Sequence, residues 1–562
     1  MKGSNLIAPD AAVRKTKKGI YKKASLFALT LSLSLSANAQ DWQLDWARNF
    51  GASGQIINSK AVATDNAGNV YITGTFKGTV DFDPSAGTAN LTSTGSIQDM
   101  FIAKYNAGGG YVWAKALLGS YQSVSNGIAV DGSGNVYIAG CFAYTVDFDG
   151  DAGTANLTAA GTGNAYDIFL AKYDNNGAYQ WAKGIGNTSH DKAMGLAKDG
   201  SGNLYLTGQF SGTVDFDPSA GTANVAAGCT SSTNIFIAKY DQNGGYLWAK
   251  SMSGCTSGDI GNDIAVDASG NAYITGSFKA TVDFDPDAGT ANLTAANEDI
   301  FLAKYDNNGA YQWAHNFGSV SIDAGRCVAL DGAGGVYISG EVMGNTADFD
   351  PSAGTATVGA FDGSYLAKYD QSGNYKWVKG YSYSSSLGHA LTASASGVYV
   401  GFKPLDGVLH KYSATGDSLW TGEFTYTAIS DILPVADTLY FTGYFTGTTD
   451  FDPSAATVNL SAIGTNDGFV AKLKKNASTA VNQVRNQDNL FTIYPNPANG
   501  KINLTLPQGG ARVLITDMQG KALRQYDLRA FKAQIAPELP AGTYLVYVSN
   551  AGLEMAQKLV IQ

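Results

Sequence analysis

Residues 131–183 read DGSGNVYIAGCFAYTVDFDGDAGTANLTAAGTGNAYDIFLAKYDNNGAYQWAK, and versions of this sequence recur seven times along the chain. A repeat of this length is typical of closed or stacked architectures, in which each unit packs on its neighbours. Four short apolar runs alternate with turn residues in each unit, as in GIAV, NVYI, IFLA and YQWA. Four short β-strands per unit predict the blade of a β-propeller.

The unit is longer than a bare four-stranded blade. The tryptophans of the fourth strand, from Trp46 to Trp377, are 64–68 residues apart, whereas Trp377 and Trp420 are separated by 43. The shorter unit lacks the motif Asp-Phe-Asp, and its length is close to the roughly 40–45 residues of a simple blade. The additional residues are therefore predicted to form an insertion between the second and third strands.

The two ends of the array are each incomplete. Residues 42–50 supply a fourth strand without the three strands that should precede it, and the last unit ends at residues 469–473 without a fourth strand. Pairing of the two ends would complete a blade and remove exposed sheet edges. The sequence predicts an all-β fold with a closed seven-bladed β-propeller over residues 40–473, whose long loops and inserted hairpins share one face.

The first 39 residues have the composition of a secretory signal peptide. Six basic residues between Arg14 and Lys23 precede an apolar run, residues 24–35, which is followed by Ala37-Asn38-Ala39. This pattern predicts cleavage before Gln40. The apolar run is shorter than the roughly 20 residues of a bilayer span, and no later segment approaches that length. No transmembrane segment is expected.

The chain is acidic. Its formal net charge is −10, and removal of residues 1–39 takes away seven basic residues and one acidic residue, which gives about −16. An acidic surface repels phosphate backbones, so nucleic acid is not an expected partner, whereas cations and neutral sugars are compatible with it.

The motif Asp-Phe-Asp recurs in six units. Alternate residues of a strand point to one side, so each motif presents two carboxylates together, and oxygen ligands of this kind suit calcium. The favoured alternative is structural, because the motif leads into a turn such as Asp-Pro-Ser-Ala-Gly, where aspartate accepts backbone N–H groups. The candidate calcium ligands are Asp81, Asp83, Asp147, Asp149, Asp215, Asp217, Asp283, Asp285, Asp348, Asp350, Asp450 and Asp452.

A second set of aspartates begins the turn between the first and second strands. Each is predicted to cap its own hairpin, and a carboxylate ring around the central channel is the less favoured alternative because like charges are costly together. The recurrent lysines of Ala-Lys-Tyr and Trp-Ala-Lys are predicted to keep their ammonium groups in water. These aspartates are Asp65, Asp131, Asp199, Asp267 and Asp331.

The chain contains four cysteines, which is relevant to pairing in an exported protein. Cys229 precedes one apolar run and Cys255 follows the next, with the turn DQNG at residues 241–244 halfway between them. If these runs form a hairpin the thiols lie opposite each other, so a Cys229–Cys255 disulfide is predicted. Cys141 and Cys327 lie in strand-like runs of different repeats and are predicted to be small core residues.

No catalytic constellation is apparent in the sequence. The histidines show neither metal-ligand spacing nor a neighbouring nucleophile motif. A carboxylate duplicated six times is poorly suited to be the unique acid or base of a glycosidase. The chain is therefore not expected to be an enzyme. The four histidines are His190, His315, His389 and His410.

The composition changes after Leu473. Residues 474–489 are polar and are predicted to be a linker, and residues 490–562 contain short apolar or alternating runs that predict a small immunoglobulin-like β-sandwich. The segments YPNP, DMQGK, LPAGTY and the terminal KLVIQ resemble the C-terminal sorting domain of proteins exported by type IX secretion in Bacteroidetes-type bacteria. The resemblance implies interaction of residues 490–562 with the secretion machinery, transport across the outer membrane, and release or attachment at the cell surface.

Residues 51–472 resemble bacterial β-propeller repeats with the motifs Gly-Asn-x-Tyr, Asp-x-Phe-x-Ala-Lys-Tyr and Trp-Ala-Lys. That family is described by its fold, so the resemblance leaves the ligand open. The sequence favours a secreted or surface-displayed binding protein for a glycan or another extracellular partner, without a cofactor. The loop residues Tyr121, Tyr144 and Tyr166 are candidates for stacking on sugars.

Two alternatives to a binding protein remain. A hydrolase or lyase acting on extracellular polysaccharide would have unrepeated polar residues converging in the central channel. A structural component of the cell surface or matrix would self-associate without a small ligand.

Overall fold

The computed structural model describes residues 42–475 and 492–562, apart from residues 95–96, 162, 230–231, 257, 344–345, 359–362, 383–388, 403–405, 455, 507–510, 518–520, 529–531 and 551–552. The predicted signal peptide and most of the predicted linker lie outside these residues. The described part of the chain consists of strands and their connections, and it contains no helix able to span a membrane.

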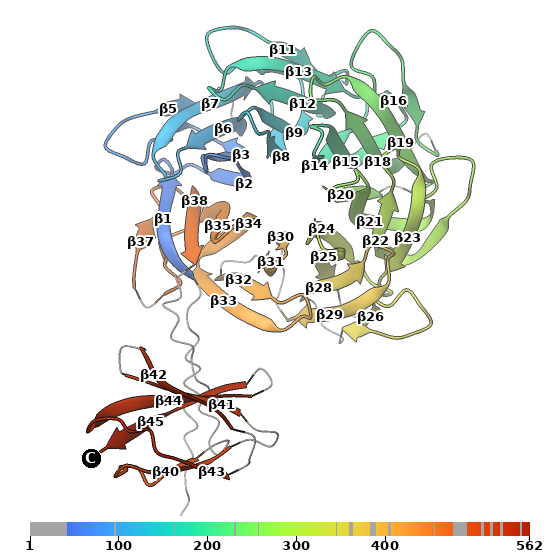
Figure 1. The fold of residues 1–562 in the computed structure, drawn as a ribbon. Helices are drawn as coiled ribbons and strands as arrows, with labels where there is room; N and C mark the ends of the chain where they lie inside the picture. Colours follow the sequence, from blue (N-terminus) through green and yellow to red (C-terminus); the bar gives the residue numbers. More distant parts are fainter. Residues whose placement is uncertain are drawn as a thin grey trace, which may run out of the picture. The chain divides into compact units, whose positions relative to one another are not determined.

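The strands of the repeats form consecutive antiparallel groups of four. In Figure 1 the groups follow one another around a ring, with the first strand of each group nearest the centre. The first four groups are β2 (Ile57–Thr64), β3 (Val70–Phe76), β6 (Asp99–Tyr105) and β7 (Tyr111–Gly119); β8 (Val124–Val130), β9 (Val136–Phe142), β12 (Asp167–Tyr173) and β13 (Tyr179–Ile185); β14 (Lys192–Lys198), β15 (Leu204–Ser211), β18 (Thr233–Tyr240) and β19 (Tyr246–Gly254); and β20 (Ile260–Val266), β21 (Ala272–Asp283), β22 (Asn292–Tyr305) and β23 (Tyr311–Phe317).

The ring continues through three further sets of strands. They are β24 (Ala324–Leu330), β25 (Gly335–Val342), β28 (Gly363–Asp370) and β29 (Tyr375–Tyr381); β30 (His389–Ser394), β31 (Gly397–Phe402), β32 (Asp406–Tyr412) and β33 (Ser418–Thr425); and β34 (Thr427–Val435), β35 (Thr438–Phe445), β38 (Asp467–Lys475) and β1 (Trp42–Phe50). The last set joins the two ends of the array, as the sequence predicted. Strand β1 pairs antiparallel with β38 from Trp42 opposite Lys475 to Phe50 opposite Gly468, so β38 extends two residues into the predicted linker.

The insertions form short hairpins on the outer rim of the ring, visible at β5, β11, β16 and β37 in Figure 1. As predicted, the insertion of the second group lies beside a long loop: β10 pairs with the end of the outer strand β7 of the preceding group, where the connection to β8 begins. In the fourth group, β21 and β22 themselves extend into the hairpin. The separate short strands are β4 (Thr79–Asp81) and β5 (Asn90–Thr92), β10 (Thr145–Asp147) and β11 (Asn156–Thr158), β16 (Thr213–Asp215) and β17 (Asn224–Ala226), β26 (Ala347–Asp348) and β27 (Thr357–Val358), and β36 (Thr448–Asp450) and β37 (Asn459–Ser461).

A lysine and a tryptophan of one group hold the main chain of the next group. Lys239 Nζ and Trp248 Nε1 each donate to the carbonyl oxygen of Asn307 at 3.2 Å, and the ammonium lies 4.8 Å from the centre of the Tyr205 ring. The corresponding carbonyls at Gln371 and at Ala414 accept the same pair of donors. The prediction that these Ala-Lys-Tyr lysines extend into water is therefore wrong, and they connect neighbouring groups.

The C-terminal residues form two sheets around their own core. One sheet contains β39 (Thr492–Tyr494), β40 (Ile502–Thr505) and β43 (Lys532–Ile535), and the other contains β42 (Ala522–Leu528), β41 (Ala511–Thr516), β44 (Gly542–Asn550) and β45 (Leu553–Ile561). Ile502, Leu504, Val513, Val546 and Leu559 are buried between them.

Candidate functional site

The Asp-Phe-Asp carboxylates accept hydrogen bonds within their own turns. Asp81 Oδ1 accepts the N–H groups of Asp83 at 3.0 Å and Ala89 at 2.8 Å, and Asp83 Oδ1 accepts that of Ser85 at 2.9 Å. The first aspartate makes the same two contacts in the other five motifs. Within the described residues, no group of three or more His, Cys, Asp or Glu side chains is arranged to hold a metal. These contacts favour the turn role, and calcium binding stays a prediction.

The second set of aspartates caps hairpins. Asp131 Oδ1 accepts the N–H groups of Ser133 and Asn135 at 2.9 Å, and Oδ2 accepts the Tyr137 hydroxyl at 3.2 Å. Burial raises the pKa of Asp131, but hydrogen bonds from Asn135, Ser133 and Tyr137 outweigh it and leave the pKa lowered. None of these five aspartates is among the described residues that line the cavity at the centre of the ring, between the first strands of the groups.

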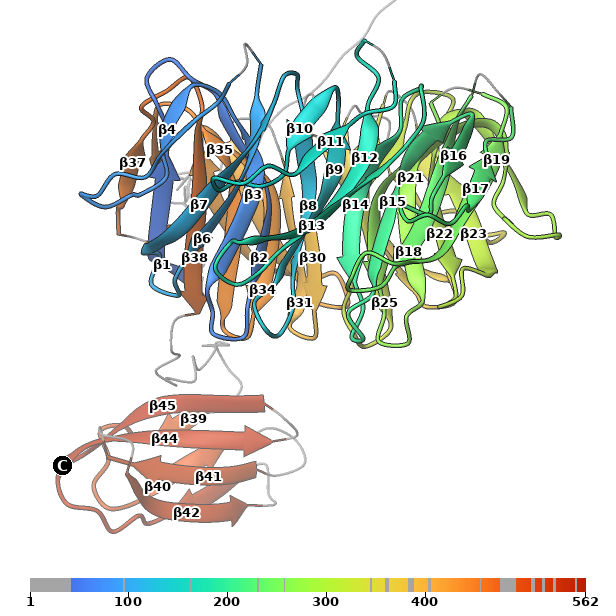
Figure 2. The ribbon, with the colours of Figure 1, turned by 90° about the horizontal axis from the view of Figure 1, so that it is seen from above.

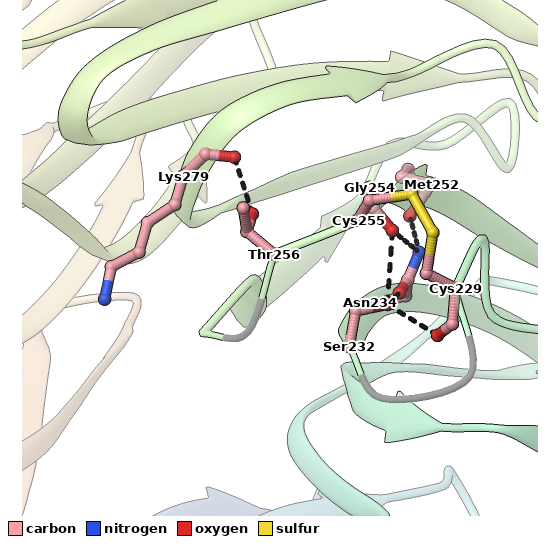
Figure 3. Close-up of a disulfide and its surroundings, with 8 residues drawn as sticks. All are labelled: Cys229, Ser232, Asn234, Met252, Gly254, Cys255, Thr256 and Lys279. Carbon is pink, nitrogen blue, oxygen red and sulfur yellow. Dashed lines mark hydrogen bonds between the residues drawn. A yellow bond between two sulfur atoms is a disulfide. The ribbon is translucent and has the colours of Figure 1, made fainter.

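The structure contains the predicted disulfide between Cys229 and Cys255 (Figure 3). The bond joins the loop before β18 to the end of β19. Ser232 Oγ donates to the Cys229 carbonyl at 2.8 Å, and Asn234 Nδ2 donates to the Met252 carbonyl at 3.1 Å. These contacts connect the disulfide loops to the buried hairpin below them.

Aromatic and basic side chains gather on the loops around the second group and at the first residue of β14, in a surface that we call the aromatic patch: Tyr121, Tyr144, Tyr166, His190 and Lys192. The ring centres of Tyr121 and Tyr144 are 5.4 Å apart, and those of Tyr166 and His190 are 5.8 Å apart. Lys192 Nζ lies 4.8 Å from the centre of the Tyr166 ring. Burial raises the pKa of Tyr166, and interactions with Cys141 and Tyr121 add to the shift.

Tyr144 occupies a backbone position that favours glycine. Its φ is 56°. The same position is filled by glycine in three other repeats, at Gly78, Gly212 and Gly447 with φ of 78°, 70° and 64°, and by Ala280 with φ of 52° in the fourth repeat. A bulky residue in this left-handed region costs roughly 1–2 kcal/mol and is a sign of a functional constraint. The Tyr144 side chain is 42% exposed, so burial does not explain its presence.

The first strands of the groups enclose a central cavity of about 530 Å³. Most of these strands contain a β-bulge, in which one additional residue changes the direction of a side chain. The bulge residue differs from repeat to repeat, and each one lines the cavity. These residues are Lys60, Asn126, Met194, Asn262, Arg326 and Ser430.

Two carboxylates at the cavity wall hold adjacent strands together. Asp263 Oδ2 accepts the N–H of Val328 at 2.9 Å, and Asp431 Oδ2 accepts that of Val62 at 2.8 Å. Burial raises the pKa of both carboxyls to about 7, although the main-chain donors oppose the shift.

The tyrosines of the aromatic patch were predicted from the sequence, whereas the bulge residues of the cavity were not. A signal was present, since the position two or three residues after the start of an inner strand carries Lys, Asn, Met, Arg or Ser in different repeats. Strand alternation alone does not reveal that a bulge turns this residue toward the channel.

These features define a protein built from propeller repeats and followed by a separate export domain. Residues 492–562 match the model of the secretion system C-terminal sorting domain, and residues 45–75 and 115–140 match that of the beta-propeller repeat. The sorting domain indicates export by type IX secretion to the cell surface or the extracellular space.

Curated relatives and solved structures are distant. An uncharacterized WD repeat-containing protein of Acanthamoeba polyphaga mimivirus is 27% identical over 259 residues, which cover 42% of this chain and 18% of the relative. The regulatory protein FlaEY of Caulobacter vibrioides is 24% identical over 454 residues, covering 71% of this chain and 43% of the relative. The chain thus spans less than half the length of either. Chaetomium thermophilum Raptor is 9% identical with a TM-score of 0.38, covering 78% of this chain and 29% of Raptor.

Proposed function

We propose that this is a secreted or cell-surface propeller that binds a glycan through the aromatic patch, without catalysing a reaction. The observation that carries the proposal is Tyr144, an exposed tyrosine at a left-handed position where other repeats have glycine. Aromatic rings present an apolar face together with a polar edge, which suits the faces and hydroxyl groups of sugars. The export domain supports an extracellular ligand.

The architecture proposed for this function is a closed seven-bladed β-propeller followed by an immunoglobulin-like β-sandwich. A rigid ring supports binding because its loops are held at fixed positions by the strands. The aromatic patch draws on four such loops, located before β8, after β9, before β12 and before β14.

A hydrolase or lyase with its site in the channel is the second candidate, favoured by the unrepeated polar residues of the central cavity. It ranks lower because both carboxylate oxygens of Asp263 and of Asp431 already accept main-chain N–H groups. A general acid or base needs an oxygen within reach of substrate.

The test is native affinity electrophoresis of the chain from Gln40 onward in gels containing neutral polysaccharides. We expect at least one polysaccharide to retard the protein, and Tyr144→Gly to weaken binding about tenfold, since a ring at the centre of an interface contributes upward of about 1.4 kcal/mol. The substitution restores the glycine of other repeats, so the melting temperature should stay equal or rise.

The matched control is Tyr426→Gly. Tyr426 also lies on a loop, has φ of 61° and is 53% exposed, but it precedes β34, outside the aromatic patch. Retardation that is unchanged in Tyr144→Gly, or lost equally in Tyr426→Gly, would contradict the proposal.

A further inference from the structure

The central cavity is lined by hydrogen-bond donors that lack acceptors. Lys60 makes no hydrogen bond or ion pair with any other described residue. Arg326 Nη2 pairs with Glu341 Oε2 at 3.2 Å, but its buried Nε has no partner in the described chain. The buried hydroxyl of Ser430 likewise bonds to none of the described residues. A cation and two polar groups are thus left without partners on three inner strands that surround the cavity, β2, β24 and β34.

The carboxylates of the cavity wall, in contrast, already accept hydrogen bonds from the main chain. Asp263 accepts the N–H groups of Ile264 and Val328, and Asp431 accepts those of Ile432 and Val62, all at 2.8–2.9 Å. Their negative charge is therefore directed at the main chain of the inner strands. The side-chain amides of Asn126 and Asn262 donate to carbonyl oxygens of the following strands.

Donors without protein partners in the wall of a channel are costly unless water or a ligand satisfies them. A buried polar group without a hydrogen bond costs several kcal/mol, and a buried charge without a partner costs more. Burial lowers the pKa of Lys60, and no neighbouring carboxylate opposes the shift. A volume of about 530 Å³ lies in the range of small-molecule sites.

We propose that the central cavity is a second binding site, which takes a small solute bearing an oxyanion through Lys60, Arg326 and Ser430. The oxyanion is a carboxylate or a chemically similar group rich in acceptors. The site is distinct from the aromatic patch, because no residue of the patch lines the cavity and the three donors lie on β2, β24 and β34.

The test compares glucuronate with glucose, which share a sugar ring but differ in the carboxylate. The chain from Gln40 onward is titrated by calorimetry and melted with each compound. Glucuronate is expected to bind and to raise the melting temperature, because a ligand that binds only the folded state stabilises it, whereas glucose is expected to do neither. Equal binding of the two compounds, or no binding of glucuronate, overturns the proposal.

Two variants locate the site. Lys60→Met should weaken glucuronate binding about tenfold or more, since hydrogen bonds to charged groups are among the stronger ones, and should raise the melting temperature of the free protein by removing an uncompensated charge. Lys77→Met, in the loop after β3 and outside the cavity lining, should change neither quantity. Unchanged glucuronate binding in Lys60→Met overturns the proposal, as does weakening of equal size in Lys77→Met.

A third variant separates this proposal from the glycan proposal. Tyr144→Gly should bind glucuronate as the parent chain does, because Tyr144 is remote from the three donors. Loss of glucuronate binding in this variant would move the oxyanion site to the aromatic patch and overturn its assignment to the cavity.

Discussion

Two residues at the proposed binding sites differ from those at the corresponding positions of most other repeats. Tyr144 takes a backbone conformation that glycine adopts elsewhere in the chain, and Lys60 takes a bulge position filled by Asn, Met, Arg or Ser in other repeats. The twelve Asp-Phe-Asp carboxylates, in contrast, are explained by the turns that they close. The repeated carboxylates thus have structural roles, whereas the two binding sites that we propose are built on residues that differ between repeats.

The buried carboxyl of Asp431 is expected to make the stability of the folded chain depend on pH. Burial raises the pKa of its carboxyl to about 7 in the folded chain, against a usual value of 3.8, so the folded state holds this proton more tightly than the unfolded state. The stabilisation is complete below about pH 4 and is lost as the pH rises through 7. Asp263 and Asp191, with pKa values also raised to about 7, act in the same direction.

We therefore expect the free energy of unfolding to fall between pH 5 and pH 8. Asp431→Asn, which cannot titrate, should flatten this decline by up to about 1.4 kcal/mol per pH unit. Urea unfolding at several pH values measures the slope, with Asp417→Asn on an exposed turn as the control. An identical slope in parent and Asp431→Asn would show that Asp431 does not titrate as described.

At the scale of elements, the contacts between neighbouring groups can be tested by removing one donor. Trp248→Phe keeps an aromatic ring but loses the Nε1 hydrogen bond to Asn307, so we expect a loss of stability of about 1 kcal/mol. Trp181 is the matched control, because its buried Nε1 has no partner among the described residues. Thermal unfolding should show a smaller loss for Trp181→Phe, and equal losses would mean that ring packing alone stabilises these junctions.

The disulfide adds a constraint within the third group. Cys229 and Cys255 are 26 residues apart, and a loop of this length is expected to stabilise the folded chain by about 3 kcal/mol through restriction of the unfolded chain. The double substitution Cys229→Ala, Cys255→Ala should lower the melting temperature by a corresponding amount. A reducing agent should lower it in the parent chain and leave the double variant unchanged; equal sensitivity in both would place the effect elsewhere.

For the molecule as a whole, patterns within one repeat were readable from the sequence, and contacts between repeats were largely not. Strand alternation and turn residues predict the four-stranded unit, and the incomplete ends predict the pairing of β1 with β38. The partner of Lys239 is a carbonyl oxygen 68 residues away, at Asn307, and a backbone acceptor leaves no mark on sequence pattern. The bulges that turn Lys60 and Arg326 into the channel are hidden as well, because a shift in strand register is not visible in the alternation of apolar and polar residues.

The pairing of β1 with β38 also determines the edge of the ring from which the two chain ends leave. Trp42 lies opposite Lys475, and the main-chain N–H of Lys475 donates to Asp437 in the tight turn after β34. Both chain ends of the ring therefore leave from the edge that carries the tight turns, while the aromatic patch belongs to the opposite edge, which carries the long connections; Figure 2 shows the ring from the side, with its two edges apart. A tether joined at either end would therefore hold the ring at its tight-turn edge and leave the loops of the aromatic patch facing away from the point of attachment.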